Sequence, residues 1–446
     1  MIPGATCRTR LFLAGALLLL AACSPPEPTQ LDQSPATPSP APAETPTPAP
    51  TPEPSPTPLY IPSRRMETSK LFNGVQLETS LSTEPGGAAT AELVSPPSYA
   101  LHLDLDVRIP TAVSSQEELA ALNPDLPALF PGFGQWISTA KISPLYERLY
   151  RHKIAYLQQN LVRLDELMTR HDFYDCETML EIQPPGTTRK LLWIQSDMDV
   201  DSDGSDSDRV PVVDAGSQTF QPITSYKWPK RGAAPNPFAP AREARLAGLQ
   251  ASLALAVSPV QRQQLTDEID ATRWELRQLQ VNSFLVAATD PYIVIPSSVI
   301  GQKDDAFSPA IGDYCAVVYG TAIYPAIIGD VGPTSKVGEA SLRIAQELNP
   351  LATSENRPVS ALKISYLVFP GTADHPFAPP DLAHWHDRVD ALLKEAGGYN
   401  GQLFQWKDLT VPPPTPTPST TPLPSVSPSS SASGSPSAVP SPSASP

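Results

Sequence analysis

Apolar and polar positions along the chain follow two periods, and these periods predict where its helices and strands lie. Residues 99–108, YALHLDLDVR, alternate apolar and polar side chains, as a half-buried strand does. Ser143-Pro144 is a helix-start signal, and the apolar residues behind it, from Tyr150 to Met168, recur at spacings of three and four. We therefore expect a long helix with one buried stripe, followed by short strands at 178–182 and 190–195.

The later part of the chain combines both periods. Residues 241–280 hold two helical patterns separated by Ser258-Pro259, which predicts a hairpin of two helices inserted into the domain. Helices are also expected at 339–348 and 382–396. Strand patterns occur at 283–288, 292–296, 314–319, 322–328 and 363–369. Short strands with helices at their edges indicate an α+β fold with a small mixed or antiparallel barrel-like core, similar in its later half to a double-psi barrel.

The two ends of the chain differ from this body. Residues 1–22 carry arginines before an apolar run that is too short to span a membrane, as in a secretory signal peptide. Leu-Ala-Ala-Cys at 20–23 resembles a bacterial lipobox, so Cys23 is expected to carry lipid; the alternative is an ordinary signal with a chance cysteine. Residues 23–60 and 411–446 are rich in Pro, Thr and Ser and predict a disordered stalk and tail. Together these features predict an exported protein anchored in the cell envelope, at the outer membrane or cell surface.

The body between the stalk and the tail is acidic. Without the two arginines of the signal and the four acids of the stalk, 29 basic and 42 acidic residues remain, a net charge of −13. This balance argues against nucleic acid as a partner and suits a cationic ligand.

Two cysteines remain in the body, Cys176 and Cys315. In an oxidising compartment they could form one disulfide; the alternative is two buried free thiols. Neither their number nor their spacing indicates a zinc site, and the chain has no phosphate loop or nucleotide fingerprint. No metal or other cofactor is expected.

Asp330 and Glu339 are the leading candidates for chemistry. They lie nine residues apart, between a predicted strand and a predicted helix, and a nearby carboxyl pair allows one group to give a proton while the other takes one. The alternative is structural: Asp330 makes a turn beside Gly329, and Glu339 complements the start of a helix.

An Asp-dense run, DMDVDSDG at 197–204, allows three interpretations. Its acids fit the first positions of an EF-hand calcium loop, but position twelve would be Val210 instead of Glu. It could also be a solvated acidic loop. In the third interpretation Asp197 and Asp199 leave the end of a strand and bind a cationic substrate.

Four motifs occur in a fixed order in the later part of the chain. They are DMDVDSDG at 197–204, DPYIVIP at 290–296, IGDVGP at 328–333 and GEASL at 338–342. As a set they resemble family 75 of the glycoside hydrolases, the fungal-type chitosanases, over roughly residues 189–369. The chain departs from those enzymes at Ser202, where they tend to have Cys, and at Ile328, where they show Trp. The resemblance makes 181–400 a chitosanase-like catalytic domain and leaves 61–180 as an added layer of strands and helices.

The resemblance also implies roles for individual residues. Asp330 and Glu339 take the catalytic positions of an enzyme that inverts anomeric configuration, which requires carboxyls roughly 6.5–9.5 Å apart. We assign Asp330 as base and Glu339 as acid; the reverse stays open because a helix start favours a charged Glu339. Asp197 and Asp199 would bind the ammonium groups of glucosamine. Tyr226 and Trp228 could stack on sugar faces or pack in the core.

The sequence thus predicts an endo-acting glycoside hydrolase that cleaves a chitosan-like β-1,4-linked glucosamine polymer. One alternative is a non-catalytic surface protein that binds a cationic or amino-sugar polysaccharide, and another is a hydrolase of peptidoglycan. The expected partners are the polysaccharide and, through the lipid on Cys23, the membrane.

Overall fold

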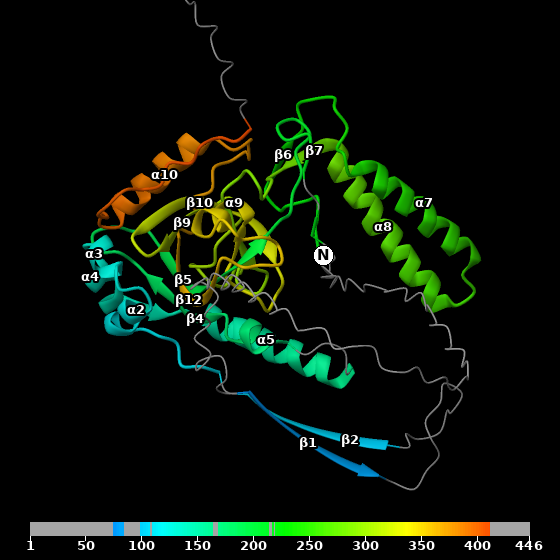
Figure 1. The fold of residues 1–446 in the computed structure, drawn as a ribbon, viewed down its shortest axis with the longest axis horizontal. Coiled ribbons are helices and arrows are strands. Elements are labelled where there is room, and N and C mark those ends of the chain that lie inside the picture. The colour runs from blue at the N-terminus through cyan, green and yellow to red at the C-terminus, as the bar shows by residue number, and fades with distance from the viewer. Residues whose placement is uncertain are drawn as a thin grey trace, which may run out of the picture. The chain divides into compact units, whose positions relative to one another are not determined.

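The computed structural model describes residues 75–83, 99–107, 109–163, 168–213, 216–217 and 219–410 (Figure 1). The predicted signal peptide, Cys23, the stalk and the tail lie outside these residues. Across the described ranges, no helix combines the length and apolar character needed to cross a membrane.

Six strands close into a barrel, in the order β5, β11, β8, β10, β9, β12 and back to β5. Their bounds are β5 (Leu191–Asp201), β8 (Tyr292–Pro296), β9 (Tyr314–Tyr319), β10 (Ala322–Gly332), β11 (Glu339–Ser341) and β12 (Val359–Val368). The β8–β10 and β5–β11 pairs are parallel, and the remaining pairs of the ring are antiparallel. The predicted α+β fold with a barrel-like core is therefore confirmed.

The barrel strands form where the chain is continuously apolar. Every residue of β8 is buried, as is every residue of β9 before Tyr319. Strands that are covered on both faces have such uninterrupted runs of Val, Ile and Tyr, because no face is left for polar side chains.

Strand β5 joins the barrel to the strands that precede it in the chain. Its first part pairs with both β12 and β4 (Cys176–Ile182), and β4 pairs with β3 (Lys141–Ile142). Its last three residues pair with β11. Residues 197–201 of the Asp run are therefore strand. The EF-hand interpretation is wrong because a strand, and not a helix, leads into the segment that would be the calcium loop.

Helices surround the sheet. They are α2 (Gln116–Leu122), α3 (Leu126–Leu129), α4 (Phe133–Thr139), α5 (Pro144–Arg163), α6 (Arg170–Phe173), α9 (Leu342–Leu348) and α10 (Leu382–Glu395). Helix α10 buries one stripe of apolar residues at helical spacing, and the indole N–H of Trp136 in α4 donates to the Ala396 carbonyl oxygen just beyond α10, at 2.8 Å. Helix α5 begins at Pro144, as predicted, and residues 164–167 of its expected continuation are not among those described.

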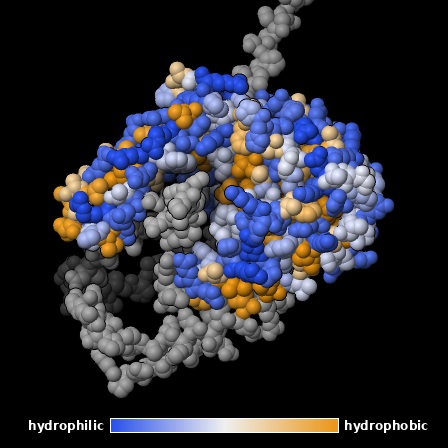
Figure 2. All heavy atoms as spheres, turned by 180° about the vertical axis from the view of Figure 1, so that it is seen from behind, coloured by the Kyte–Doolittle hydropathy of each residue, from blue (hydrophilic) through white to orange (hydrophobic). Residues whose placement is uncertain are grey.

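The predicted helical hairpin is confirmed as α7 (Ala239–Leu255) and α8 (Pro259–Val281). Ion pairs join the two helices, with Arg242 contacting Glu275 at 2.9 Å. Figure 2 shows hydrophobic surface on the arm that the hairpin forms, and Leu255 and Val257 at its turn are 82% and 92% exposed. Strand β7 (Asn282–Phe284) follows α8 and pairs with β6 (Lys227–Pro229); it is shorter than the predicted strand at 283–288.

A separate two-stranded sheet contains β1 (Val75–Thr83) and β2 (Tyr99–Val107), paired antiparallel. Strand β2 confirms the strand predicted at 99–108. Strand β1 was not predicted.

Cys176 and Cys315 are free and buried, so the second of the two alternatives is correct. Cys176 begins β4, and Cys315 lies in β9, three strands away along the order β4, β5, β12, β9. Three strand spacings amount to roughly 14 Å along the sheet. A disulfide needs Cα atoms within about 7 Å of each other.

Candidate active site

Asp330 owes its orientation to a β-bulge. The parallel pairing of β10 with β8 matches Ile328 to Ile293 and Asp330 to Val294, which leaves Gly329 as an extra residue. In a regular strand Ile328 and Asp330, two residues apart, would lie on the same face. The bulge makes them pair with neighbouring residues of β8, so Asp330 lies on the opposite face. Only glycine fits here, because a Cβ atom at position 329 would lie 2.6 Å from Cγ of Tyr292.

Glu339 lies in strand β11 and not in the first turn of a helix, as the sequence had suggested; helix α9 begins three residues later. Strand β11 inserts between β8 and β5, so Glu339 pairs with Val294 on one side and with Asp199 on the other. Gly338 allows this close insertion: its φ is 81°, and a Cβ atom there would lie 2.7 Å from the Asp197 carbonyl oxygen.

The pairing brings the two candidate carboxyls to one face of the barrel wall. Asp330, Val294 and Glu339 form a row across three neighbouring strands, with Val294 in the middle. Residues paired in register share a face, and two strand spacings separate the outer Cα atoms by roughly 9.5 Å. Both acids are half-buried as whole residues.

Fixed donors surround the Asp330 carboxyl. Its Oδ1 accepts hydrogen bonds from the Ser225 N–H at 3.0 Å, the Ser225 hydroxyl at 2.5 Å and the Val331 N–H at 2.7 Å. Burial and the nearby Asp201 charge raise the pKa of Asp330 to about 7, although these hydrogen bonds act to lower it.

Among the described residues, no side chain or main-chain N–H donates to the Glu339 carboxyl. Burial first, and then the charges of Asp201, Asp199 and Asp330, raise the pKa of Glu339 to about 8, while Lys336 lowers it. The two carboxyls thus differ in the number of donors that stabilise their charged forms.

Two acids that the sequence did not single out as site residues complete this face. One carboxyl oxygen each from Asp201, Asp203 and Asp330 lies within 4.8 Å of the other two. Three carboxylates at this spacing are a minimal arrangement for a cation. Both Asp201 oxygens, however, already accept hydrogen bonds, from the Tyr292 hydroxyl at 2.9 Å and from the Asp203 N–H at 2.7 Å, and we assign no metal ligands here. The alternating acids of DVDSD at 199–203 could have identified Asp201 and Asp203 as site residues, since alternate residues of a strand share a face.

Asp197 and Asp199 lie on the same strand face but are engaged by cationic side chains of the protein. Arg357 contacts Oδ2 of Asp197 at 3.0 Å and Oδ1 of Asp199 at 2.8 Å, and Lys336 pairs with Asp199. His171 also contacts Asp197, and burial raises the Asp197 pKa well above its ordinary value. A substrate ammonium group would have to compete with these partners, so the predicted binding role gains no support from this arrangement.

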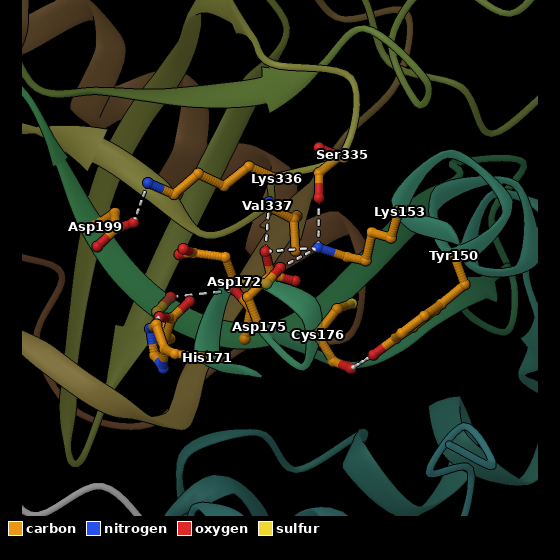
Figure 3. A network of polar contacts seen from close by, with 12 residues as sticks. Tyr150, Lys153, His171, Asp172, Asp175, Cys176, Asp199, Ser335, Lys336 and Val337 are labelled. Carbon is orange, nitrogen blue, oxygen red and sulfur yellow. Dashed lines mark hydrogen bonds and ion pairs between the residues drawn. The ribbon is translucent and has the colours of Figure 1, made fainter. Parts of the chain in front are cut away.

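A buried ion pair holds the loop between the two candidate carboxyls (Figure 3). The Lys153 ammonium of helix α5 contacts Asp175 at 2.8 Å and donates to the Ser335 carbonyl oxygen. Asp175 in turn accepts the Val337 N–H at 3.1 Å. The residues before 181 therefore support the segment that delivers Glu339, a connection between distant parts of the chain that no local pattern predicts.

Tyr226 and Trp228 are 7% and 2% exposed. The Tyr226 ring stacks on Phe377 at 4.4 Å, and Trp228 lies beneath the guanidinium of Arg209 at 5.2 Å. Of the two predicted roles, core packing is the one that the structure shows. The Tyr226 N–H donates to the Gly329 carbonyl oxygen at 2.8 Å, which fixes neighbouring Ser225 against Asp330.

Residues 198–397 match the family model of the fungal chitosanases of glycosyl hydrolase group 75. None of the curated proteins matches the chain. The matched segment begins inside β5, ends just after α10 and includes Asp199, Asp201, Asp203, Asp330 and Glu339. The resemblance seen in the four sequence motifs is confirmed: residues 198–397 of this chain match glycosyl hydrolase group 75, a chitosanase family of glycoside hydrolases, over the segment that carries both candidate carboxyls.

Proposed function

We propose that this protein is an endo-acting glycoside hydrolase that cleaves β-1,4-linked glucosamine polymer of the chitosan type with inversion of anomeric configuration. The observation that carries the proposal is the placement of Asp330 and Glu339 on one face, on either side of Val294, inside the segment that matches the chitosanase family. Their Cα separation of roughly 9.5 Å is compatible with the wider carboxyl spacing of inverting enzymes, which leaves room for a water.

The donors around the two acids favour Asp330 as the base. Three hydrogen bonds stabilise the Asp330 carboxylate, whereas none of the described residues donates to Glu339. Burial and the charge of Asp201 raise the pKa of Glu339 to about 8, which favours the protonated form that an acid needs. Because Glu339 lies in a strand, the helix-dipole objection to its acting as the acid no longer applies.

In the proposed reaction, Asp330 takes a proton from a water whose oxygen attacks the anomeric carbon. The bond from that carbon to the glycosidic oxygen breaks, and the leaving oxygen takes the proton of Glu339. The products are an inverted hemiacetal and an alcohol. Asp330 ends protonated and Glu339 ionised, and exchange with solvent restores both.

The test is release of reducing ends from chitosans of varied acetylation by the wild type, Asp330→Asn and Glu339→Gln. We expect each variant to lose activity by a factor of 10² or more, because each removes a proton-transfer group. Asp387→Asn is the matched control for loss of an acid, since the Asp387 side chain is 82% exposed on α10. Wild-type turnover in both site variants would refute the assignment.

The same assay separates the alternatives. NMR of the first product formed should show the inverted anomer, and viscosity should fall early if cleavage is internal. Binding of chitosan without release of reducing ends would support a binding protein instead. Release from peptidoglycan alone would support the third hypothesis.

We also propose that the protein is exported and tethered in the cell envelope by lipid on Cys23. The support is the lipobox-like sequence at 20–23 after the apolar run. Metabolic labelling with a fatty acid should mark the wild type and not Cys23→Ser. Equal labelling of both proteins would contradict the anchor.

A further inference from the structure

Asp201 is a buried acid on the face that carries Asp330 and Glu339. It is 6% exposed and ends strand β5, two residues beyond Asp199, which pairs with Glu339. Alternate strand residues share a face, so the Asp201 and Glu339 side chains lie on the same side of the barrel wall.

The protein holds the Asp201 carboxyl in place at both oxygens. The hydroxyl of fully buried Tyr292 donates to Oδ2 at 2.9 Å, and the Asp203 N–H donates to Oδ1 at 2.7 Å. No lysine, arginine or histidine of the described residues pairs with Asp201. Burial raises the pKa of Asp201 above its ordinary value, and these two hydrogen bonds act to lower it. They also fix the orientation of the carboxyl.

The other charged groups around Glu339 are arranged differently. Asp199 faces it from β5 but is paired with Lys336 and Arg357. Asp330 faces it from β10, and Asp203 lies in the loop after β5, within the group of oxygens shared with Asp201 and Asp330. The Lys336 ammonium lowers the pKa of Glu339, but it is engaged by Asp199.

We propose that Asp201 is a positioning residue whose negative charge helps Glu339 to hold the proton that this acid donates. This inference rests on the proposed function, because it explains how the acid of that reaction stays protonated. Asp201 need not touch the sugar; it acts through Glu339 and Asp330. A neighbouring like charge disfavours ionisation, and the effect is large in a buried setting. Asp201 is the first charge after burial among the causes that raise the pKa of Glu339, Asp330 and Asp203.

The test is the pH profile of Asp201→Asn, which removes the charge and keeps an oxygen to accept hydrogen bonds. Loss of the charge should lower the pKa of Glu339 and of Asp330 together. Both limbs of the bell-shaped profile should therefore move to lower pH, by about one unit or more. A lower maximum with unmoved limbs would show that Asp201 is only structural and would overturn the proposal.

Two further variants make the test specific. Asp387→Asn should leave both limbs in place, because it removes an exposed charge. Tyr292→Phe removes the donor to Asp201, makes the Asp201 anion less favourable and should move the limbs in the same direction by a smaller amount. It also serves if Asp201→Asn does not fold, which circular dichroism would reveal. A shift to higher pH in Tyr292→Phe would contradict the proposal.

A second readout needs no turnover. Carbon-13 NMR of glutamate side-chain carboxyls, with the Glu339 signal identified by its loss in Glu339→Gln, follows the titration of Glu339. Its pKa should fall in Asp201→Asn even if the protein hydrolyses nothing. Hydrolysis with an unchanged Glu339 titration would leave the proposed function standing and remove this inference.

Discussion

At the scale of single residues, Asp330 and Glu339 are two half-buried acids with different hydrogen-bond surroundings. Burial acts on both, and it raises both pKa values. The difference comes from Ser225 and Val331, which supply three donors to Asp330, while none of the described residues donates to Glu339. The assignment of base and acid therefore rests on hydrogen bonds to neighbours and not on residue type.

Ser225→Ala should raise the pKa of Asp330, because it removes the hydroxyl donor and leaves the Ser225 N–H. A base works only when ionised, so the acid limb of the pH profile should move to higher pH. One hydrogen bond to a charged group corresponds to a shift of about one unit. The profile of the variant checks this, with Ser138→Ala on the exposed face of α4 as the control. An acid limb that stays in place would show that the hydroxyl does not stabilise the charged base.

At the scale of elements, the site depends on irregular features of regular strands. The bulge at Gly329 turns Asp330 toward the site, and the short strand β11 places Glu339 between β8 and β5. Helix α5, through Lys153, holds the loop that joins them. Each of these features fixes the backbone at Asp330 or near Glu339. This matters because misplacement of a reacting group by about 1 Å can reduce a rate about a hundredfold.

Gly329→Ala should damage both stability and activity. Its Cβ atom would lie 2.6 Å from Cγ of Tyr292 and 2.7 Å from Cδ1 of Leu285, so the bulge must shift. Overpacking of this kind costs about 1–3 kcal/mol, and activity should fall about a hundredfold as Asp330 moves.

Denaturant unfolding and the reducing-end assay measure the two effects. Gly248→Ala in helix α7 is the matched control, since a Cβ atom there meets nothing within 4 Å. That variant should be unchanged or more stable by up to about 1 kcal/mol. Equal behaviour of the two variants would mean that the bulge tolerates a side chain.

At the scale of the whole molecule, the barrel keeps several acids in surroundings that disfavour their charge. The pKa values of Asp175, Asp330, Asp203 and Glu339 are raised to between about 7 and 8, mainly by burial. A carboxyl whose pKa is raised by folding stabilises the protein below its ordinary pKa, and this contribution is lost as the pH rises through the folded value. Above neutral pH, ionisation of these buried carboxyls therefore lowers the free energy of unfolding.

The double variant Asp330→Asn/Glu339→Gln should therefore be more stable than the wild type at pH 8. The amides carry no charge to bury, and the melting temperature should rise by several degrees. The gain should vanish near pH 4, where the wild-type carboxyls are protonated. Thermal melts followed by circular dichroism at pH 4, 6 and 8 provide the comparison. A wild type that melts higher than the variant at pH 8 would contradict the burial argument.

Much of the fold could be predicted from local patterns. The helical hairpin, the start of α5, the α10 stripe and most barrel strands follow from apolar spacing and helix-start residues, because burial leaves a periodic record in the sequence. For Glu339 the sequence predicts the first turn of a helix at 339–348. In the structure Glu339 instead pairs with β8 and β5 as part of strand β11. The strand has three residues, too few for an alternating pattern to be recognised in the sequence.

The sequence by itself determined most of the barrel strands, the longer helices and, through the resemblance of four ordered motifs, the two acids proposed for catalysis. Only the tertiary structure decided which face Asp330 occupies, that the Asp run is strand, and that Arg357 neutralises Asp197 and Asp199. Lys153 and Ser335 are 182 positions apart and Asp197 and Arg357 are 160 apart, yet each pair is in direct contact. Charge and hydrogen bonding depend on distance in space, whereas sequence periodicity records only whether a position is buried.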